Sequence, residues 1–169
     1  MRKLIVKAII LGGIIPVIFA CNSHTEKEQP ATVLADKDQV IDKEQIKAEI
    51  QAKEDEFAST YNAGVLKSIG YYADDAVSFY QNRAPLVGKG AIVEFLKADL
   101  NSNSNTIMFN TNEVFVSSDG NQVVELGNYR VIDSTKTTVN SGNYMSLFEK
   151  RNGKYVCLRD MSASDVPPQ

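Results

Sequence analysis

TTVNSGNYMSLFEKRNGKYVCLRDMS, residues 137–162, is the stretch of this chain that decides its fold. Its two halves, residues 137–150 and 154–162, have the composition and spacing of strands. Between them stands Asn152-Gly153, and both residues tolerate the positive φ that a two-residue hairpin turn needs. Asp119-Gly120 gives the same signal between the strand patterns 106–117 and 123–133. We therefore predict a four-stranded antiparallel meander in the C-terminal half.

Upstream of the meander, apolar residues recur at helical spacing. Ile46, Ile50, Phe57 and Tyr61 mark one amphipathic helix from Lys43, with Asp42 as N-cap and Gly64 as its end. Residues 65–72 predict a short second helix, residues 76–80 a strand, and residues 88–100 a third helix. Three helices followed by a meander predict one α+β domain over residues 43–165, with the helices on one face of a curved sheet.

Three segments in this order are similar to a known family: YYADDAV at 71–77, PLVGKG at 85–90 and FEKRNGKY at 148–155. The chain resembles the NTF2-like superfamily, and within it the SnoaL-like and DUF4440 group. The resemblance implies a cone, in which a strongly curved, mainly antiparallel sheet wraps a long helix around an apolar pocket. It also implies a homodimer formed through the outer face of the sheet. Gly127 and Gly142, inside strand patterns, suit sharp bending or close approach.

Aromatic residues are predicted to line this pocket. Several of them are tyrosines, whose hydroxyl groups normally find a partner when buried, so the pocket should combine an apolar wall with a few polar groups. Its ligand would be small and largely apolar. The predicted lining residues are Phe57, Tyr61, Tyr72, Phe79, Tyr80, Phe95, Phe109, Tyr129 and Tyr144.

The same superfamily includes ketosteroid isomerase, which uses a carboxylate base and an oxyanion hole of a tyrosine and a protonated aspartic acid. In this sequence the position of that base falls on Tyr80, and the oxyanion tyrosine falls near Phe57. Isomerase chemistry is therefore not supported. Tyr80 and Asp160 are the remaining candidates for catalysis. Because Arg159 and Asp160 alternate along a strand, only one can face the pocket, and a surface or structural role for Asp160 is favoured.

Composition disfavours several other kinds of site. The single histidine, His24, precedes the domain, and no spacing of residues suggests a metal site, a phosphate loop or a dinucleotide site. We predict no cofactor and no metal. Removing the three basic residues of positions 1–20 from a chain of net charge −3 leaves −6, which disfavours nucleic acid as a partner. Cys157, in an apolar strand pattern, is interpreted as a buried small hydrophobic residue.

The N-terminus has the pattern of an export signal. Arg2, Lys3 and Lys7 precede an uncharged, mostly apolar run at 8–19, and Ala20 precedes Cys21. Residues 18–21 resemble a bacterial lipobox, which implies cleavage after residue 20 and lipidation of Cys21. Residues 21–42 are polar and predict a flexible tether. The expected location is the bacterial cell envelope, anchored by lipid in the outer membrane, since Asn22 replaces the aspartate associated with inner-membrane retention.

Three functions fit these features. The first is a lipid-anchored module that binds a small apolar ligand in its cone; it is favoured over an enzyme because the domain lacks histidine. The second is a cofactor-independent isomerase, cyclase or hydrolase. The third is an accessory subunit with a vestigial pocket. An enzyme requires a buried ionisable group with a displaced pKa in the pocket, whereas an accessory subunit requires almost no cavity.

Overall fold

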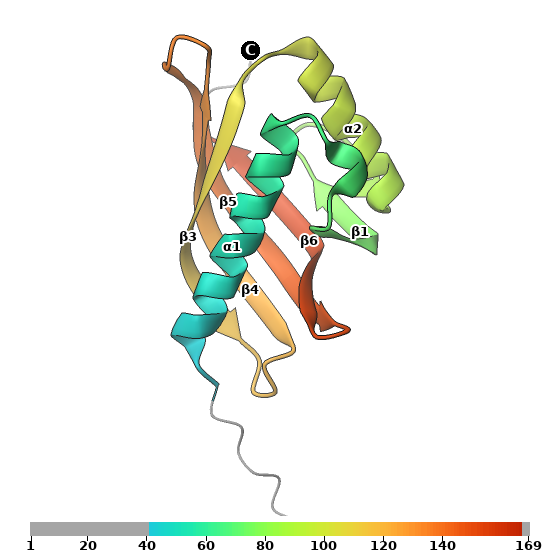
Figure 1. Cartoon of the computed structure of the whole chain (residues 1–169), viewed down its shortest axis with the longest axis vertical. Coiled ribbons are helices and arrows are strands. Elements are labelled where there is room, and N and C mark those ends of the chain that lie inside the picture. The colour runs from blue at the N-terminus through green and yellow to red at the C-terminus, as the bar shows by residue number, and fades with distance from the viewer. Residues whose placement is uncertain (1–40, 167–169) are drawn as a thin grey trace, which may run out of the picture. The chain divides into compact units, whose positions relative to one another are not determined.

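In the computed structural model, which describes residues 41–166, helix α1 (Lys43–Asn62) lies along the concave side of a sheet (Figure 1). The Asp42 side chain accepts a hydrogen bond from the backbone N–H of Gln45 at 3.0 Å, so the predicted N-cap is confirmed. The helix ends before Gly64, whose φ is +70°. Its buried face is the predicted apolar stripe together with one residue that the prediction omitted, Glu54.

The predicted second helix, residues 65–72, is wrong. Only one 3-10 turn forms, η1 (Leu66–Ser68), and the backbone is already extended at Ile69. The reason is pairing with the last strand, because the backbone N–H of Cys157 donates to the Tyr71 carbonyl at 2.8 Å. Strand β1 (Tyr72–Phe79) therefore begins four residues earlier than predicted. It carries both Tyr71, just before it, and Tyr72 into the core.

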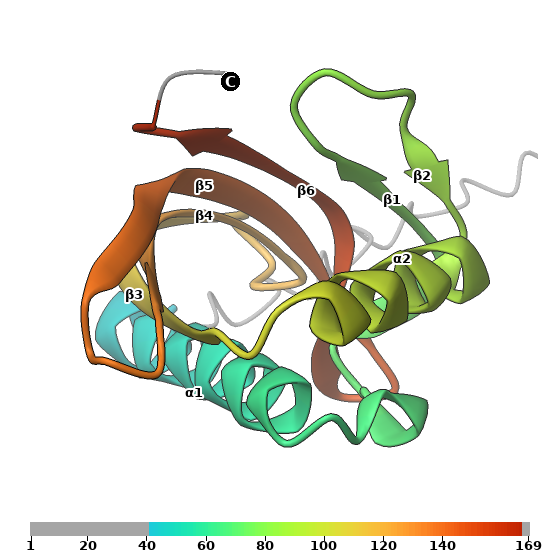
Figure 2. The same cartoon turned by 90° about the horizontal axis from the view of Figure 1, so that it is seen from above.

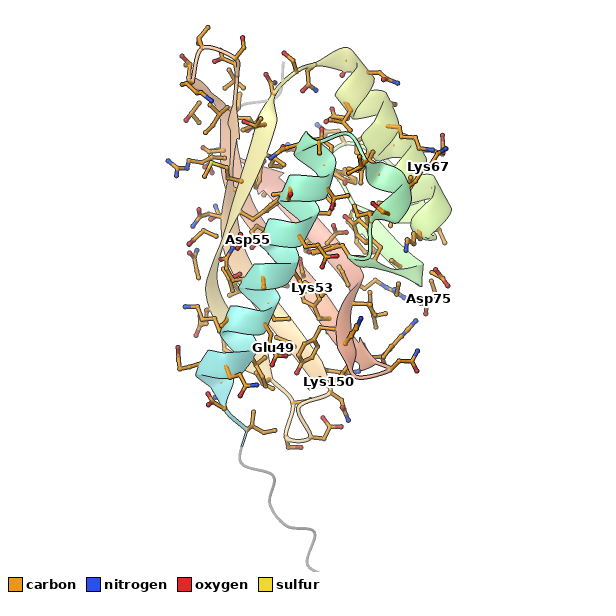
Figure 3. The ribbon with its side chains drawn as sticks, viewed as in Figure 1. Glu49, Lys53, Asp55, Lys67, Asp75 and Lys150 are labelled. Atoms are coloured by element: carbon orange, nitrogen blue, oxygen red, sulfur yellow. The ribbon has the colours of Figure 1, made fainter. Side chains whose placement is uncertain are left out.

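Because β1 begins early, Asp74 and Asp75 lie inside this strand. Both are exposed. The Asp75 carboxylate receives two hydrogen bonds from the Arg151 guanidinium, at 2.5 and 3.1 Å. Figure 3 shows Asp75 at the edge of the molecule. This pair is a surface contact and takes no part in a buried site.

The predicted antiparallel meander is confirmed as β3 (Thr106–Val116), β4 (Gln122–Ile132), β5 (Thr138–Arg151) and β6 (Lys154–Ser164). β1 adds to it in parallel with β6, and the short β2 (Leu86–Val87) pairs with β1. The sheet order is therefore β2-β1-β6-β5-β4-β3. Figure 2 shows this sheet curving around α1 and α2 (Lys89–Ser102), which both lie on its concave side.

Two glycines allow tyrosine rings to lie flat on the concave face of the sheet. Gly127 on β4 is paired with Tyr144 on β5, and Tyr129 on β4 is paired with Gly142 on β5. A Cβ on Gly127 would overlap the Tyr144 ring, and a Cβ on Gly142 would lie 2.7 Å from the Tyr129 ring. The missing side chains therefore permit a close approach, as the sequence suggested, and fix where the two rings stand.

Several sequence predictions concern residues outside the described range. The signal peptide 1–20, the lipidation of Cys21 and nearly all of the tether 21–42 fall there, so the division into signal, tether and domain stays a prediction. Among residues 41–166, no helix is long and apolar enough to cross a membrane.

Candidate functional site

A cavity of about 280 Å³ opens between the concave face of the sheet and the two helices. The structure places every predicted pocket residue in its wall, together with Tyr71, which the prediction omitted. Two side chains of the wall stand at its rim, since Phe79 is 41% exposed and Met161 54% exposed. The aromatic wall residues are Phe57, Tyr61, Tyr71, Tyr72, Phe79, Tyr80, Phe95, Phe109, Tyr129 and Tyr144.

Asp160 also lines the cavity, so of the surface or structural role favoured from the sequence, the surface position is wrong. It alternates with Arg159, which points outward and donates to the Asp75 carbonyl at 3.2 Å. The hydroxyl of Tyr72 donates to Asp160 Oδ2 at 2.9 Å, while Asp160 Oδ1 is shielded from solvent and has no partner in hydrogen-bonding geometry among the described residues. Burial raises the pKa of this carboxyl, and the hydroxyls of Ser78 and Tyr72 partly offset the rise.

Tyr80, the second predicted catalytic candidate, follows β1 and packs its ring on Phe95 with 4.5 Å between centroids. Burial raises the pKa of its phenol above the ordinary value of 10, and the charges of Asp160 and Asp99 raise it further. The phenol is therefore protonated at neutral pH. It can donate a hydrogen bond into the cavity, but it is a poor base.

Glu54, on α1, supplies a carboxyl that the sequence prediction missed. Tyr71 Oη donates to Glu54 Oε1 at 2.5 Å, and Tyr71 Oη also lies 3.4 Å from the Ser146 hydroxyl. Burial raises the pKa of Glu54 well above 4.5, and the neighbouring Glu125 raises it further. A carboxyl without a cation beside it avoids the cost of a buried charge by keeping its proton.

Glu125, on β4, lies behind the cavity wall and was also missed. Its Oε1 accepts hydrogen bonds from Thr111 Oγ1 at 2.5 Å and Tyr144 Oη at 2.7 Å, while its Oε2 is buried without a partner among the described residues. Burial raises the pKa of Glu125, and the hydrogen bonds from the Thr111 and Tyr144 hydroxyls partly offset that rise. Glu54 and Glu125 therefore form a pair whose joint negative charge the interior disfavours.

A third carboxyl of the wall comes from α2. Tyr61 Oη donates a short hydrogen bond to Asp99 Oδ2, which joins the two helices across the cavity. The ionisable wall residues other than tyrosine are thus Glu54, Asp99 and Asp160, and the described wall contains no lysine, arginine or histidine. Among residues 41–166, no three His, Cys, Asp or Glu side chains are arranged to hold a metal ion.

Cys157 does not contribute to the cavity. It is fully buried, and its thiol donates to the Arg159 carbonyl at 3.4 Å. Burial raises the pKa of the thiol, which keeps it protonated and unreactive. The interpretation of Cys157 as a buried small residue is confirmed.

The sequence did carry a signal for the missed carboxyls. Glu54 falls in the apolar stripe of α1, four residues after Ile50 and three before Phe57, and so faces the core. Glu125 alternates with Val123 and Gly127 on the inward face of β4. A charged residue at a core position of a strong pattern is a site candidate, since such residues are almost never fully buried without a partner.

No family model and no curated protein sequence matches this chain. Solved structures do resemble it. An NTF2-like protein with a cystatin-like fold from Novosphingobium aromaticivorans shares 13% identity over 73% of this chain and 84% of its own length, with a TM-score of 0.63. A domain of unknown function with a cystatin-like fold from Nostoc punctiforme shares 16% identity over 72% and 78%, at 0.62. A ketosteroid isomerase-like protein from Erwinia carotovora atroseptica shares 17% over 71% and 96%, at 0.57.

These similarities establish the fold class: the described domain has the NTF2-like cone, as the sequence predicted. At such low identity they carry the fold alone.

We predict that Glu54→Gln removes part of the pH dependence of stability. Because the pKa of Glu54 is raised on folding, its contribution is complete below about pH 4.5 and is lost as pH rises through the raised pKa. Each unit of that rise corresponds to about 1.4 kcal/mol. Relative to wild type, the variant should therefore gain about 1 kcal/mol or more between pH 5 and pH 8.

Urea unfolding followed by circular dichroism at both pH values measures this gain. Glu49→Gln, at an exposed position on the same helix (Figure 3), is the matched control and should unfold with the wild-type pH dependence. An unchanged pH dependence in Glu54→Gln would contradict the account.

Proposed function

We propose that this protein binds a small, largely apolar molecule in its cone. One observation supports this most directly: a cavity of about 280 Å³ whose wall is mostly aromatic, with a few carboxyl and hydroxyl groups converging on it. Ligand sites in proteins have this composition, with apolar walls for affinity and a few polar groups for orientation. At roughly 30 Å³ for each water molecule in the liquid, the cavity has room for about nine waters, or a ligand of about ten non-hydrogen atoms.

The cavity counts against an accessory subunit whose pocket is filled by its own side chains. A cofactor-independent enzyme is the second candidate, because Asp160 gives it a specific feature: a buried carboxyl of raised pKa at hydrogen-bond distance from the Tyr72 hydroxyl. A carboxyl whose pKa moves toward neutral can both donate and accept a proton, as general acid–base catalysis requires. Tyr80 would act only as a hydrogen-bond donor.

We expect Ser162→Trp to abolish ligand retention. Ser162, on β6 opposite Tyr144, lines the cavity, and an indole there would occupy much of the space. Native mass spectrometry of wild type and variant, each purified from the source organism, measures retention. Wild type should carry an added mass that the variant lacks.

Ser104→Trp places the same side chain at an exposed position between α2 and β3 and should retain the ligand. A wild type whose native mass equals that of the ligand-free protein would count against binding in the cone.

We also propose that lipid on Cys21 anchors the protein in the bacterial cell envelope, in the outer membrane. The proposal rests on the basic start, the apolar run and the small residue before the cysteine. More than one acyl chain is needed for stable anchoring, and lipobox processing supplies them.

Growth with a fatty-acid analogue tests the anchor. Label should appear on wild type and on Cys157→Ser, since Cys157 is buried in the fold, and should be absent from Cys21→Ser. Label that persists on Cys21→Ser, or a wild type without label, would rule the anchor out.

A homodimer through the convex face of the sheet is a further proposal. On β4 and β5, Leu126 is paired with Met145 and Val124 with Leu147, and these four residues form one apolar row on that face. No described helix lies on the convex side of the sheet (Figure 2), and contiguous exposed apolar surface marks an interaction site. A second copy presenting the same row would bury both.

Light scattering after size exclusion tests the dimer, with Met145→Glu as the disrupting variant. Met145 is 44% exposed in this row, and a carboxylate there should convert a dimer into a monomer. Asn101→Glu, exposed on α2, should leave the mass unchanged. A wild type that is monomeric at all concentrations would disprove the dimer.

A further inference from the structure

The charge of the cavity wall has one sign. Glu54, Asp99 and Asp160 contribute carboxyl groups from α1, α2 and β6, and no basic residue lines the described wall. A carboxylate or phosphate ligand would therefore meet three acidic groups and no counter-charge, in surroundings where burial already disfavours negative charge on Glu54 and Asp160. Burying an unpaired anion there is costly. The wall discriminates against anionic ligands.

An unpartnered carboxylate oxygen in the wall also favours a cationic ligand. Asp160 Oδ2 is occupied by the Tyr72 hydroxyl, but Oδ1 is buried and has no partner among the described residues. Ser146 and Ser78 are opposite Asp160 in register, so both neighbouring strands present only hydroxyls there. A positively charged N–H group on a ligand does two things here: it donates a hydrogen bond to Asp160 Oδ1, and its charge balances that of the carboxylate.

Aromatic faces add a second attraction for a cation. Tyr80 and Phe95 pack together in the wall, and the Arg83 guanidinium lies 4.3 Å from the centroid of the Phe95 ring. Arg83 itself is exposed and does not line the cavity. This contact is a cation–π interaction within the chain, and such interactions contribute about 0.5–2 kcal/mol, most when the cation is desolvated.

We propose that the cavity selects small organic cations, namely aromatic or aliphatic amines in their ammonium form, with Asp160 and Asp99 as the charge partners and the aromatic wall around the carbon skeleton. This inference rests on the proposed binding function and names its ligand class. The ammonium group lies between β6 and α2, near Tyr80, whose pKa is raised by the charges of both aspartates. The hydrocarbon part fills the space lined by Phe57 and Phe109.

Three probes of one size and different charge test the selection at pH 7: 2-phenylethylamine, 2-phenylethanol and phenylacetate. Each fits a space for about ten non-hydrogen atoms. Isothermal titration calorimetry of the full chain, with lipid attached and in detergent, should show the ammonium bound about tenfold or more tightly than the alcohol, and the carboxylate bound weakest. Ser162→Trp should bind none of them, which places the binding in the cavity.

Two variants locate the charge partners. Asp160→Asn and Asp99→Asn should each weaken amine binding about tenfold and leave alcohol binding within about threefold, while Asp55→Asn, which removes an exposed carboxylate from α1 (Figure 3), should bind as wild type. Circular dichroism checks that each variant is folded, and Asp99, only partly buried, serves if Asp160→Asn does not fold.

The outcomes separate the two proposals. If the alcohol or phenylacetate binds as tightly as the amine, selection for cations is wrong while binding in the cone stands. If none of the three binds, selection for cations is also wrong, and the native mass of the purified protein decides the binding function by itself.

Discussion

The cavity depends on one constraint: Glu54, Glu125 and Asp160 are held away from water without a basic partner in the described structure. Burial of an unpaired carboxylate is costly, which raises the pKa of each group, and one oxygen of each carboxyl accepts hydrogen bonds from hydroxyl groups. Tyr71 donates a hydrogen bond to Glu54, and Tyr72 donates one to Asp160. Glu125 accepts from both Thr111 and Tyr144. The tyrosines are therefore hydrogen-bond donors to these acids as well as apolar wall.

The backbone determines where those hydroxyls stand. Gly127 leaves the space in which the Tyr144 ring lies across β4, so its hydroxyl reaches Glu125. The early start of β1, paired in parallel with β6, brings Tyr72 to Asp160. A side chain at position 127 would displace the Tyr144 ring and leave Glu125 without that donor. A helix in place of the start of β1 would remove Tyr72 from Asp160 in the same way. Buried groups left without a hydrogen-bond partner cost about 1–3 kcal/mol each.

Sequence reasoning predicted most of the fold and the wall, because both follow from periodic patterns. The apolar stripe of α1, the Asn152-Gly153 and Asp119-Gly120 turns and the alternation of β3 to β6 are local signals, and each was found in the structure. The parallel pairing of β1 with β6 was missed because it joins residues far apart in the chain, and no local pattern of residues 65–72 distinguishes a short helix from an extended segment.

The buried acids were missed for a different reason. Only apolar residues were used to define the inward faces, whereas the spacing places Glu54 and Glu125 inward as firmly as their apolar neighbours. The position of Asp160 could not be predicted from alternation alone, since alternation shows only that Arg159 and Asp160 face opposite sides and a bulge in β6 decides which. A tyrosine at a core position opposite an inward-facing acid is the pattern that predicts a hydrogen bond between the two.

Carboxyl carbon NMR across a pH titration, with the Glu54 signal assigned from Glu54→Gln, reports directly whether this buried acid keeps its proton. We expect the Glu54 signal to stay at the position of a neutral acid until a pH clearly above 4.5, the ordinary pKa of a glutamic acid. A Glu54 signal that moves around pH 4.5 would contradict the burial of a protonated acid, because the cone would then hold an ionised carboxylate without a counter-charge.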